Sequence, residues 1–162
     1  MILLNNNEVH HIGQPFIPEI EGAAFRLAHL NRFNGSVGTY SVAQHCCLVA
    51  SVLPPELRLS GLLHDLCEAY LGDMASPLKK HVKDFQPLED LYCDVIDKYF
   101  DVETRHPSVR AADLRMLITE AKSFGKDLAL FPDADAYDFS IERWSPAKAE
   151  ASFLTMFRTL TR

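Results

Sequence analysis

The sequence predicts an all-α fold in a single domain. Its 162 residues are about one domain's length, enough to bury a core without disulfide bonds. Apolar residues recur at helical spacing through most of the chain, whereas no segment alternates with period two for long. Proline and glycine separate these helical segments, and the chain contains no internal repeat.

Residues 1–20 are expected to form an irregular N-terminal arm, either extended or folded as a short hairpin. Gly13, Pro15 and Pro18 interrupt any helical period within it. Residues 21–33 then carry apolar side chains at helical spacing and predict the first helix.

A second helix is expected from Ser41 to about Leu53, because the four residues beginning at Ser41 have the form of a capping box. Pro54 and Pro55 end this helix and suit the first turn of the next one. This third helix is predicted to end near Gly72.

The rest of the chain predicts one short turn of helix and three longer helices. The short turn covers residues 78–80, and two of the longer helices cover residues 87–100 and 107–124. Residues 131–143 are acidic and are expected to form a loop, after which Ser145 opens a C-terminal amphipathic helix.

Composition excludes several classes of protein. The net charge of −6 argues against a protein that coats a nucleic acid polymer, and no apolar segment is long enough to suggest a membrane partner. The cysteines show neither a CxxC pair nor the spacing of a disulfide framework. These features predict a reduced, cytoplasmic protein. The four cysteines are Cys46, Cys47, Cys67 and Cys93.

A histidine and an aspartate occupy a stretch that otherwise has the composition of a helix interior. His64 and Asp65 lie among leucines, and burying such groups is costly unless something such as a metal ion compensates them. The two side chains are about 100° apart around a helix, so one ion can contact both. His45 lies in the preceding, antiparallel helix, and Asp113 lies on an apolar stripe of a later one. These four residues are the predicted metal ligands.

This set of two histidines and two aspartates suits one divalent ion, namely Co, Mn, Zn, Fe or Mg, with positions left for water and a substrate oxygen. Such an ion lowers the pKa of bound water and neutralises a phosphoryl group. Taken singly, His45 could instead be a hydrogen-bonded core histidine, and Asp113 could pair with Arg110 or Arg115. A closed structural site is disfavoured because such sites usually recruit cysteine.

The ordered set of His45, His64-Asp65 and Asp113 resembles the ligands of the HD-domain metal-dependent phosphohydrolases. One branch of that family is especially similar, that of the small 5'-deoxyribonucleotidases and phage-type dATP triphosphohydrolases. The likeness covers residues 21–124 and rests on three motifs: Tyr40-Ser41-Val42-Ala43-Gln44-His45, His64-Asp65-x-x-Glu68-x-x-x-Gly72-Asp73 and Pro77-Leu78-Lys79.

The resemblance implies a single HD domain spanning residues 1–162, with a role for each matched residue. Glu68 would orient or deprotonate the attacking water, and Asp73 would assist near the leaving oxygen or the deoxyribose. Arg32 matches the arginine that holds the phosphate, and Phe33 matches an aromatic of the sugar and base pocket. Lys79 would be a second phosphate contact. Outside this resemblance, Glu68 and Asp73 could be a solvated helix edge and turn, Phe33 a core residue and Lys79 a solvated lysine.

The expected function is therefore metal-dependent hydrolysis of a deoxynucleotide, in which metal-activated water attacks the phosphorus nearest the sugar. A dNTP, in particular dATP, would yield deoxynucleoside and triphosphate. The alternative reaction is that of a 5'-deoxyribonucleotidase, which converts a dNMP to deoxynucleoside and phosphate. A different class of function, a non-catalytic HD protein that senses nucleotides, would be expected to have lost a metal-binding or water-handling residue. The resemblance also implies a homo-oligomer.

Overall fold

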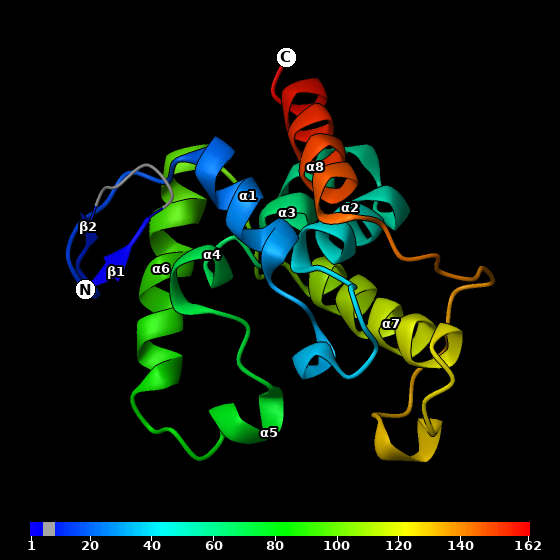
Figure 1. Cartoon of the computed structure of the whole chain (residues 1–162). Helices are drawn as coiled ribbons and strands as arrows, with labels where there is room; N and C mark the ends of the chain where they lie inside the picture. Colours follow the sequence, from blue (N-terminus) through cyan, green and yellow to red (C-terminus); the bar gives the residue numbers. More distant parts are fainter. Residues whose placement is uncertain (5–8) are drawn as a thin grey trace.

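The computed structural model describes residues 1–4 and 9–162, and the described part is an all-α bundle (Figure 1). Two antiparallel two-residue strands, β1 (Ile2–Leu3) and β2 (Val9–His10), are its only sheet. The eight α-helices of the described part are α1 (Ile20–His29), α2 (Val42–Val52), α3 (Arg58–Leu63), α4 (Glu68–Leu71), α5 (Ser76–Lys79), α6 (Phe85–Phe100), α7 (Pro107–Ser123) and α8 (Pro146–Leu160). The predicted fold class is confirmed.

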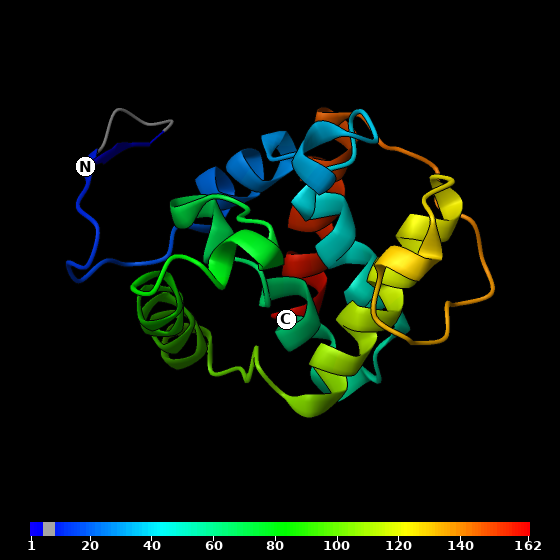
Figure 2. The same cartoon turned by 90° about the horizontal axis from the view of Figure 1, so that it is seen from below.

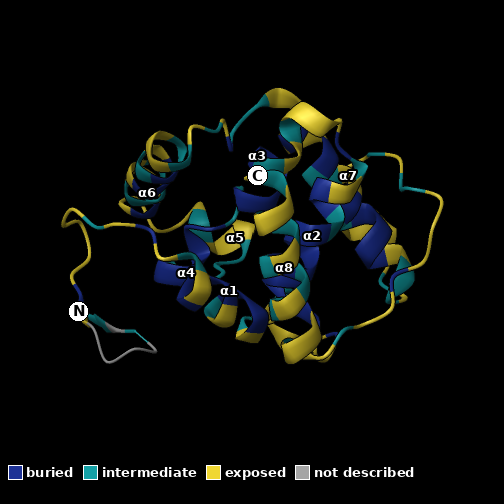
Figure 3. Cartoon of the chain, turned by 90° about the horizontal axis from the view of Figure 1, so that it is seen from above, coloured by how far each residue is buried: buried dark blue, intermediate teal, exposed yellow. Residues whose placement is uncertain are grey.

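Helix α2 lies at the centre of the bundle and packs against α1, α3, α7 and α8. Small side chains on several of its faces, among them Ala43, Cys46 and Ala50, are fully buried, which lets neighbouring helices approach closely. The Ser41 hydroxyl accepts a hydrogen bond from the Gln44 amide, as the predicted capping box requires. The four cysteines are buried free thiols, and Figure 3 shows the buried faces of α2 and α3 beside α8.

Helix α1 is shorter than its sequence pattern predicts, because it ends at His29 rather than near Phe33. The chain leaves the helix to pair with the segment before α2: the Arg32 amide donates to the Tyr40 carbonyl, and the Val42 amide donates to the Leu30 carbonyl. This pairing joins residues eight and twelve positions apart, so helical periodicity could not reveal it. It places Arg32 on an extended stretch beside α2.

The predicted third helix is divided in two at the histidine–aspartate pair. Residues 64–67 keep a helical course, but the Leu66 amide bonds to the Leu63 carbonyl and the Glu68 amide bonds to the Asp65 carbonyl. These bonds span three residues and wind the chain more tightly than an α-helix, as is often found where a helix carries a functional site. The tight turn between α3 and α4 therefore sets the directions of His64, Asp65 and Glu68.

The remaining helices largely follow the sequence. Helix α6 begins two residues before the predicted start, α7 spans nearly the predicted range, and α8 begins directly after Ser145, whose hydroxyl caps it. A short 3-10 turn, η3 (Leu128–Leu130), precedes the acidic stretch 131–143, which contains no helix or strand, as predicted. Seen from below, α6 and α7 lie on opposite sides of the central helices (Figure 2). Among the described residues, no helix combines the length and apolar character needed to cross a membrane.

Candidate metal centre and its pocket

Two histidines, one in α2 and one directly after α3, face one another. His45 lies in α2 and is fully buried, and its Nε2 lies 3.3 Å from Nε2 of His64. The other ring nitrogen of each is already bound: His45 Nδ1 lies 2.5 Å from Oε1 of Glu120, and His64 Nδ1 donates to the Gly61 carbonyl at 2.8 Å. Each histidine therefore directs Nε2 toward the other, which is how paired metal-binding histidines are held.

Two aspartates complete this cluster. Asp65 Oδ2 lies 3.1 Å from Nε2 of His64 and 3.6 Å from Nε2 of His45. Asp113, on α7, places Oδ1 at 3.0 Å from Nε2 of His45 and 3.9 Å from Nε2 of His64. Asp113 therefore contacts the histidines rather than Arg110 or Arg115. Arg115 instead donates to the Asp135 carbonyl.

The spacing of these donor atoms fits a metal ion. Ligands bound at about 2.1 Å lie about 3.0 Å apart at the corner of an octahedron and about 3.4 Å apart in a tetrahedron. The donors of His45, His64 and Asp65 all lie within 4.8 Å of one another, so these three residues could hold a metal ion together. Asp113 contacts the same two imidazoles without belonging to that compact group of three, and its role as fourth ligand is part of the proposal below.

The histidines and aspartates of the cluster shift one another's pKa values. Burial disfavours ionised Asp65, but His64 outweighs it and lowers the pKa of Asp65 to about 2. Burial also favours the neutral form of Asp113 and raises its pKa. The hydrogen bonds from His45 and His64 outweigh this effect and hold the pKa of Asp113 well below the ordinary range. Burial also opposes protonation of His64, yet Asp65 raises the pKa of His64 well above 6.5. In the metal-free protein, protons therefore hold the place that a cation would take.

Glu68 lies at the start of α4, is only 6% exposed, and borders this cluster. Burial raises the pKa of Glu68 well above its ordinary value near 4.5, and the carboxylates of Asp65 and Asp73 add to the effect. Its Oε2 is buried and has no hydrogen-bond partner among the described residues, whereas Oε1 lies 4.0 Å from Nζ of Lys79. A buried carboxylate oxygen without a partner is suited to hold a water molecule or a substrate hydroxyl.

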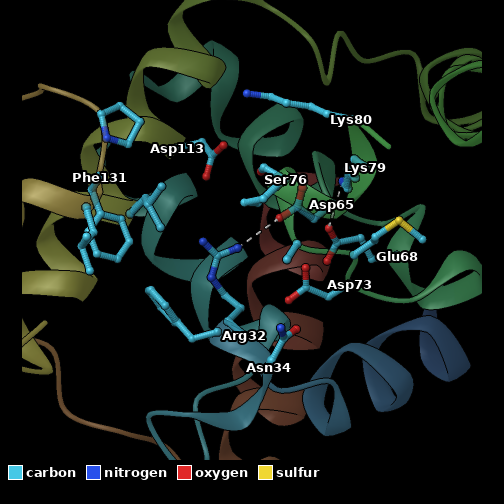
Figure 4. Close-up of a pocket in the computed structure, with 17 residues that line it drawn as sticks. Arg32, Asn34, Asp65, Glu68, Asp73, Ser76, Lys79, Lys80, Asp113 and Phe131 are labelled. Carbon is cyan, nitrogen blue, oxygen red and sulfur yellow. Dashed lines mark ion pairs between the residues drawn. The ribbon is translucent and has the colours of Figure 1, made fainter. Parts of the chain in front are cut away.

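These groups surround a cavity of about 540 Å³, within the range of small-molecule sites. In Figure 4, Phe131 lies on one side of the cavity, Glu68 and Asp73 lie on the other, and Arg32 projects between them. Of the nine predicted site residues, seven line the cavity, namely Arg32, Phe33, Asp65, Glu68, Asp73, Lys79 and Asp113. The other two, His45 and His64, do not line the cavity but contact Asp113 and Asp65, which do.

The two predicted phosphate contacts differ in how they are held. Nη1 of Arg32 lies 3.8 Å from Oδ2 of Asp65, the ion pair drawn in Figure 4. Lys79 is bound to Glu89 on α6, at 2.5 Å between Nζ and Oε1, so its charge is already compensated from outside the cavity. Lys79 is thus not freely solvated, and like Arg32, which binds Glu120 at 3.1 Å, it already has a carboxylate partner.

Phe33 has an unusual backbone conformation. Its φ is +55° and that of Asn34 is +50°, a region that side chains with a Cβ seldom adopt. The ring of Phe33 meets Phe124 and Phe131 edge-on, with 6.3 Å between centroids in each case. Phe33 therefore both packs against the core and lines the cavity, and backbone strain of this kind commonly accompanies a binding site.

The sequence did not single out Glu120, Tyr40 or Phe131 as site residues. Glu120 and Tyr40 are fully buried and hydrogen-bonded to each other at 2.7 Å, and Phe131 lines the cavity. Glu120 could have been found, because it lies seven residues after Asp113 and therefore on the same face of α7. Phe131 directly follows the short turn η3 and carries no such signal.

Comparison with known proteins identifies relatives along most of the chain. Over 149 residues it is 33% identical to the uncharacterized protein YfdR of Escherichia coli strain K12, covering 88% of this chain and 84% of the relative. The chain belongs to the YfdR family. An uncharacterized protein of Rhodobacter capsulatus is 31% identical over 138 residues, covering 75% of this chain and 68% of that protein. No family model matches the chain.

Proposed function

We propose that the protein is a metal-dependent phosphohydrolase acting on deoxynucleotides, of the HD-domain kind. One observation carries the proposal: a cluster of His45, His64, Asp65 and Asp113 with metal-ligand spacing borders a cavity that also holds Arg32. A metal ion held by this cluster, together with the nearby guanidinium, would suit a phosphate ester, because both neutralise the charge of the phosphoryl oxygens. The choice of a deoxynucleotide, and of adenine as its base, rests on the resemblance of the sequence motifs.

In this proposal His45, His64, Asp65 and Asp113 would hold one divalent ion, namely Co, Mn, Zn, Fe or Mg. Such an ion supplies Lewis acidity, which lowers the pKa of bound water and neutralises charge on a phosphoryl group. The mixed nitrogen and oxygen donors suit these metals better than a site built from thiolates would.

The chain's own residues would position the reactants and move the protons. Arg32 would hold the phosphate nearest the sugar, and the unpartnered Oε2 of Glu68 would take a proton from the attacking water. The bond between that phosphorus and the 5' oxygen breaks, so the leaving oxygen needs a proton. Burial raises the pKa of Asp73, against the opposing effect of Arg32, so its carboxyl is suited to supply that proton.

We favour a dNTP as substrate, with deoxynucleoside and triphosphate as products. Lys79 and Lys80 are adjacent cations on the cavity wall and could bind the outer phosphates. One observation favours the alternative, a 5'-deoxyribonucleotidase acting on a dNMP. Glu89 binds Lys79 at 2.5 Å, which leaves less positive charge for a polyphosphate.

The test is turnover by metal-reloaded protein. The chain is stripped of metal, resupplied with Co, Mn, Zn, Fe or Mg, and offered dNMPs and dNTPs while phosphate, triphosphate and deoxynucleoside are measured. Asp65→Ala should abolish turnover, whereas Asp84→Ala, which removes an exposed carboxylate distant in sequence from the cluster, should retain it. Nucleotide binding without turnover under any metal would instead indicate a sensing protein. Full activity of Asp65→Ala would refute the proposal.

A further inference from the structure

Glu120 on α7 connects the metal cluster to the arginine of the pocket. Its side chain is fully buried, and both of its carboxylate oxygens are engaged. Oε1 accepts hydrogen bonds from His45 Nδ1 at 2.5 Å and from the Tyr40 hydroxyl at 2.7 Å. Oε2 accepts from Arg32, at 3.2 Å from Nε and 3.1 Å from Nη2. One carboxylate thus binds a metal-site histidine and the proposed phosphate ligand together.

We propose that Glu120 is a positioning residue that aligns His45 with the metal ion and Arg32 with the phosphate. This inference rests on the proposed function, because it assigns a role within the same site. Glu120 does not line the cavity and would not touch the substrate, so it would act only through these two side chains.

The first part of the role is the choice of the histidine tautomer. An ionised carboxylate can only accept hydrogen bonds, so the proton of neutral His45 is kept on Nδ1, facing Glu120. Nε2 is then left with its lone pair toward His64 and Asp113. A carboxylate behind a metal-binding histidine fixes both the tautomer and the direction of the ring and increases its basicity.

The second part is the direction of the guanidinium. Oε2 of Glu120 accepts from both Nε and Nη2 of Arg32, two charge-assisted hydrogen bonds that turn this edge of the guanidinium toward Glu120. Nη1 is left on the cavity side, 3.8 Å from Asp65. Arg32 precedes two residues with positive φ, so its side chain is held in a turn that the backbone alone would not favour.

A purely structural role makes a different prediction. A buried ion pair rarely adds stability compared with a well-packed apolar pair, so its retention at this position calls for another reason. If Glu120 served only stability, its loss and the loss of the Tyr40 hydroxyl would act alike, by loosening α7 against α2. If Glu120 positions the site, its substitution would reduce metal and phosphate affinity, whereas loss of the Tyr40 hydroxyl would not.

The substitution that separates these readings is Glu120→Gln. The amide keeps the size of the side chain but offers one acceptor oxygen in place of two, and its NH2 group can only donate. It can accept from His45 or from Arg32, but not from both, and its NH2 group would then face the other donor. A donor facing Nδ1 of His45 would favour the tautomer that carries its proton on Nε2. In that tautomer Nε2 has no free lone pair and cannot bind the metal ion.

The experiment compares four forms of the full chain: wild type, Glu120→Gln, Glu120→Asp and Tyr40→Phe. The readouts are Co²⁺ affinity by calorimetry, inorganic phosphate affinity of the Co²⁺-loaded protein, and urea unfolding. Nitrogen-15 NMR of the metal-free protein reports the tautomer of His45. We expect Glu120→Gln to lose about 10- to 100-fold in Co²⁺ affinity, the range found when such partners are removed, and to bind phosphate more weakly even at saturating Co²⁺. Tyr40→Phe should destabilise the fold yet keep Co²⁺ affinity within about threefold.

The inference is overturned if Glu120→Gln binds Co²⁺ and phosphate as the wild type does, or if Tyr40→Phe loses as much affinity as Glu120→Gln. If Glu120→Gln does not fold, Glu120→Asp decides, because it keeps the charge but shortens the reach. Unchanged affinities in Glu120→Asp would then contradict the role. Failure of the proposed function is a separate result: wild-type protein that binds Co²⁺ but hydrolyses no nucleotide leaves every one of these comparisons measurable.

Discussion

The buried, ionised carboxylate of Glu68 should destabilise the folded state. Glu68→Gln should therefore raise the stability of the metal-free chain at pH 7. Burial and the neighbouring carboxylates of Asp65 and Asp73 raise the pKa of Glu68, and its buried Oε2 lacks a hydrogen-bond partner. Both features show that the folded state favours the neutral form. Replacing the carboxylate by an amide removes the charge and keeps the shape.

The size of the effect follows from two opposing contributions. An unsatisfied buried polar group costs about 1–3 kcal/mol, and more when it is charged. Against this, the substitution removes the attraction between Glu68 and Lys79, whose charged atoms are 4.0 Å apart. That attraction is worth less than about 1 kcal/mol, because Lys79 is partly exposed and keeps its partner Glu89. A net gain of about 1 kcal/mol is expected, equivalent to about 2–4 °C in Tm for a chain of this length.

The pH dependence gives the prediction a sign that can be tested. A carboxyl whose pKa is raised in the folded state holds its proton to a higher pH than in the unfolded chain. The cost of ionising Glu68 is therefore absent well below its ordinary pKa of about 4.5 and grows as the pH rises toward the folded value. The stability difference between Glu68→Gln and wild type should accordingly be small at pH 4 and larger at pH 7.

The assay is urea unfolding of the metal-free protein at several pH values, with Glu56→Gln as the matched control because Glu56 is exposed. The control should differ from wild type by less than about 0.5 kcal/mol. If the protein has the proposed activity, the same Glu68→Gln change should abolish turnover by the metal-loaded protein. A less stable Glu68→Gln protein at pH 7, or a gain that does not depend on pH, would refute the reasoning.

Three further predictions concern the metal, the arginine and the core. Because Asp65 raises the pKa of His64, Co²⁺ must displace a proton, and calorimetry should show affinity that increases from pH 6 to pH 8; a flat profile would contradict this. Arg32→Lys should weaken phosphate binding about tenfold, because an ammonium cannot replace the planar guanidinium; equal affinity would count against the assigned role. Gly61→Ala should destabilise the fold by about 1 kcal/mol, since its Cβ would lie 2.3 Å from Cδ1 of buried Leu53 and overpacking outweighs the gain in helix propensity; unchanged urea unfolding would show that the site relaxes freely.

Local signals in the sequence predicted much of the fold. Ser41 caps α2 as its capping box indicated, and Ser145 caps α8. Two helices joined by a short connection must lie antiparallel, so the approach of His45 to His64 was also predictable. Asp113 was found because a carboxylate on an apolar stripe needs a partner.

The rest depends on contacts that the local pattern does not contain. Helix α1 ends at His29 because the following residues pair with the strand-like segment before α2. The tight turn between α3 and α4 carries helical residues throughout, and only tertiary packing decides how they wind. Glu120 looks like an ordinary helix residue until its neighbours His45 and Arg32 are placed beside it. Its spacing of seven from Asp113 was the one available signal.

The most direct test of the central claim is to follow oxygen from water into product. Metal-loaded protein is given dATP in oxygen-18 water, and the products are analysed by mass spectrometry. Attack of water on the phosphorus nearest the sugar predicts one oxygen-18 atom in the released triphosphate and none in the deoxyadenosine. Label in the deoxyadenosine, release of phosphate with dADP, or no consumption of any dNTP or dNMP with any of the five metals would contradict the account.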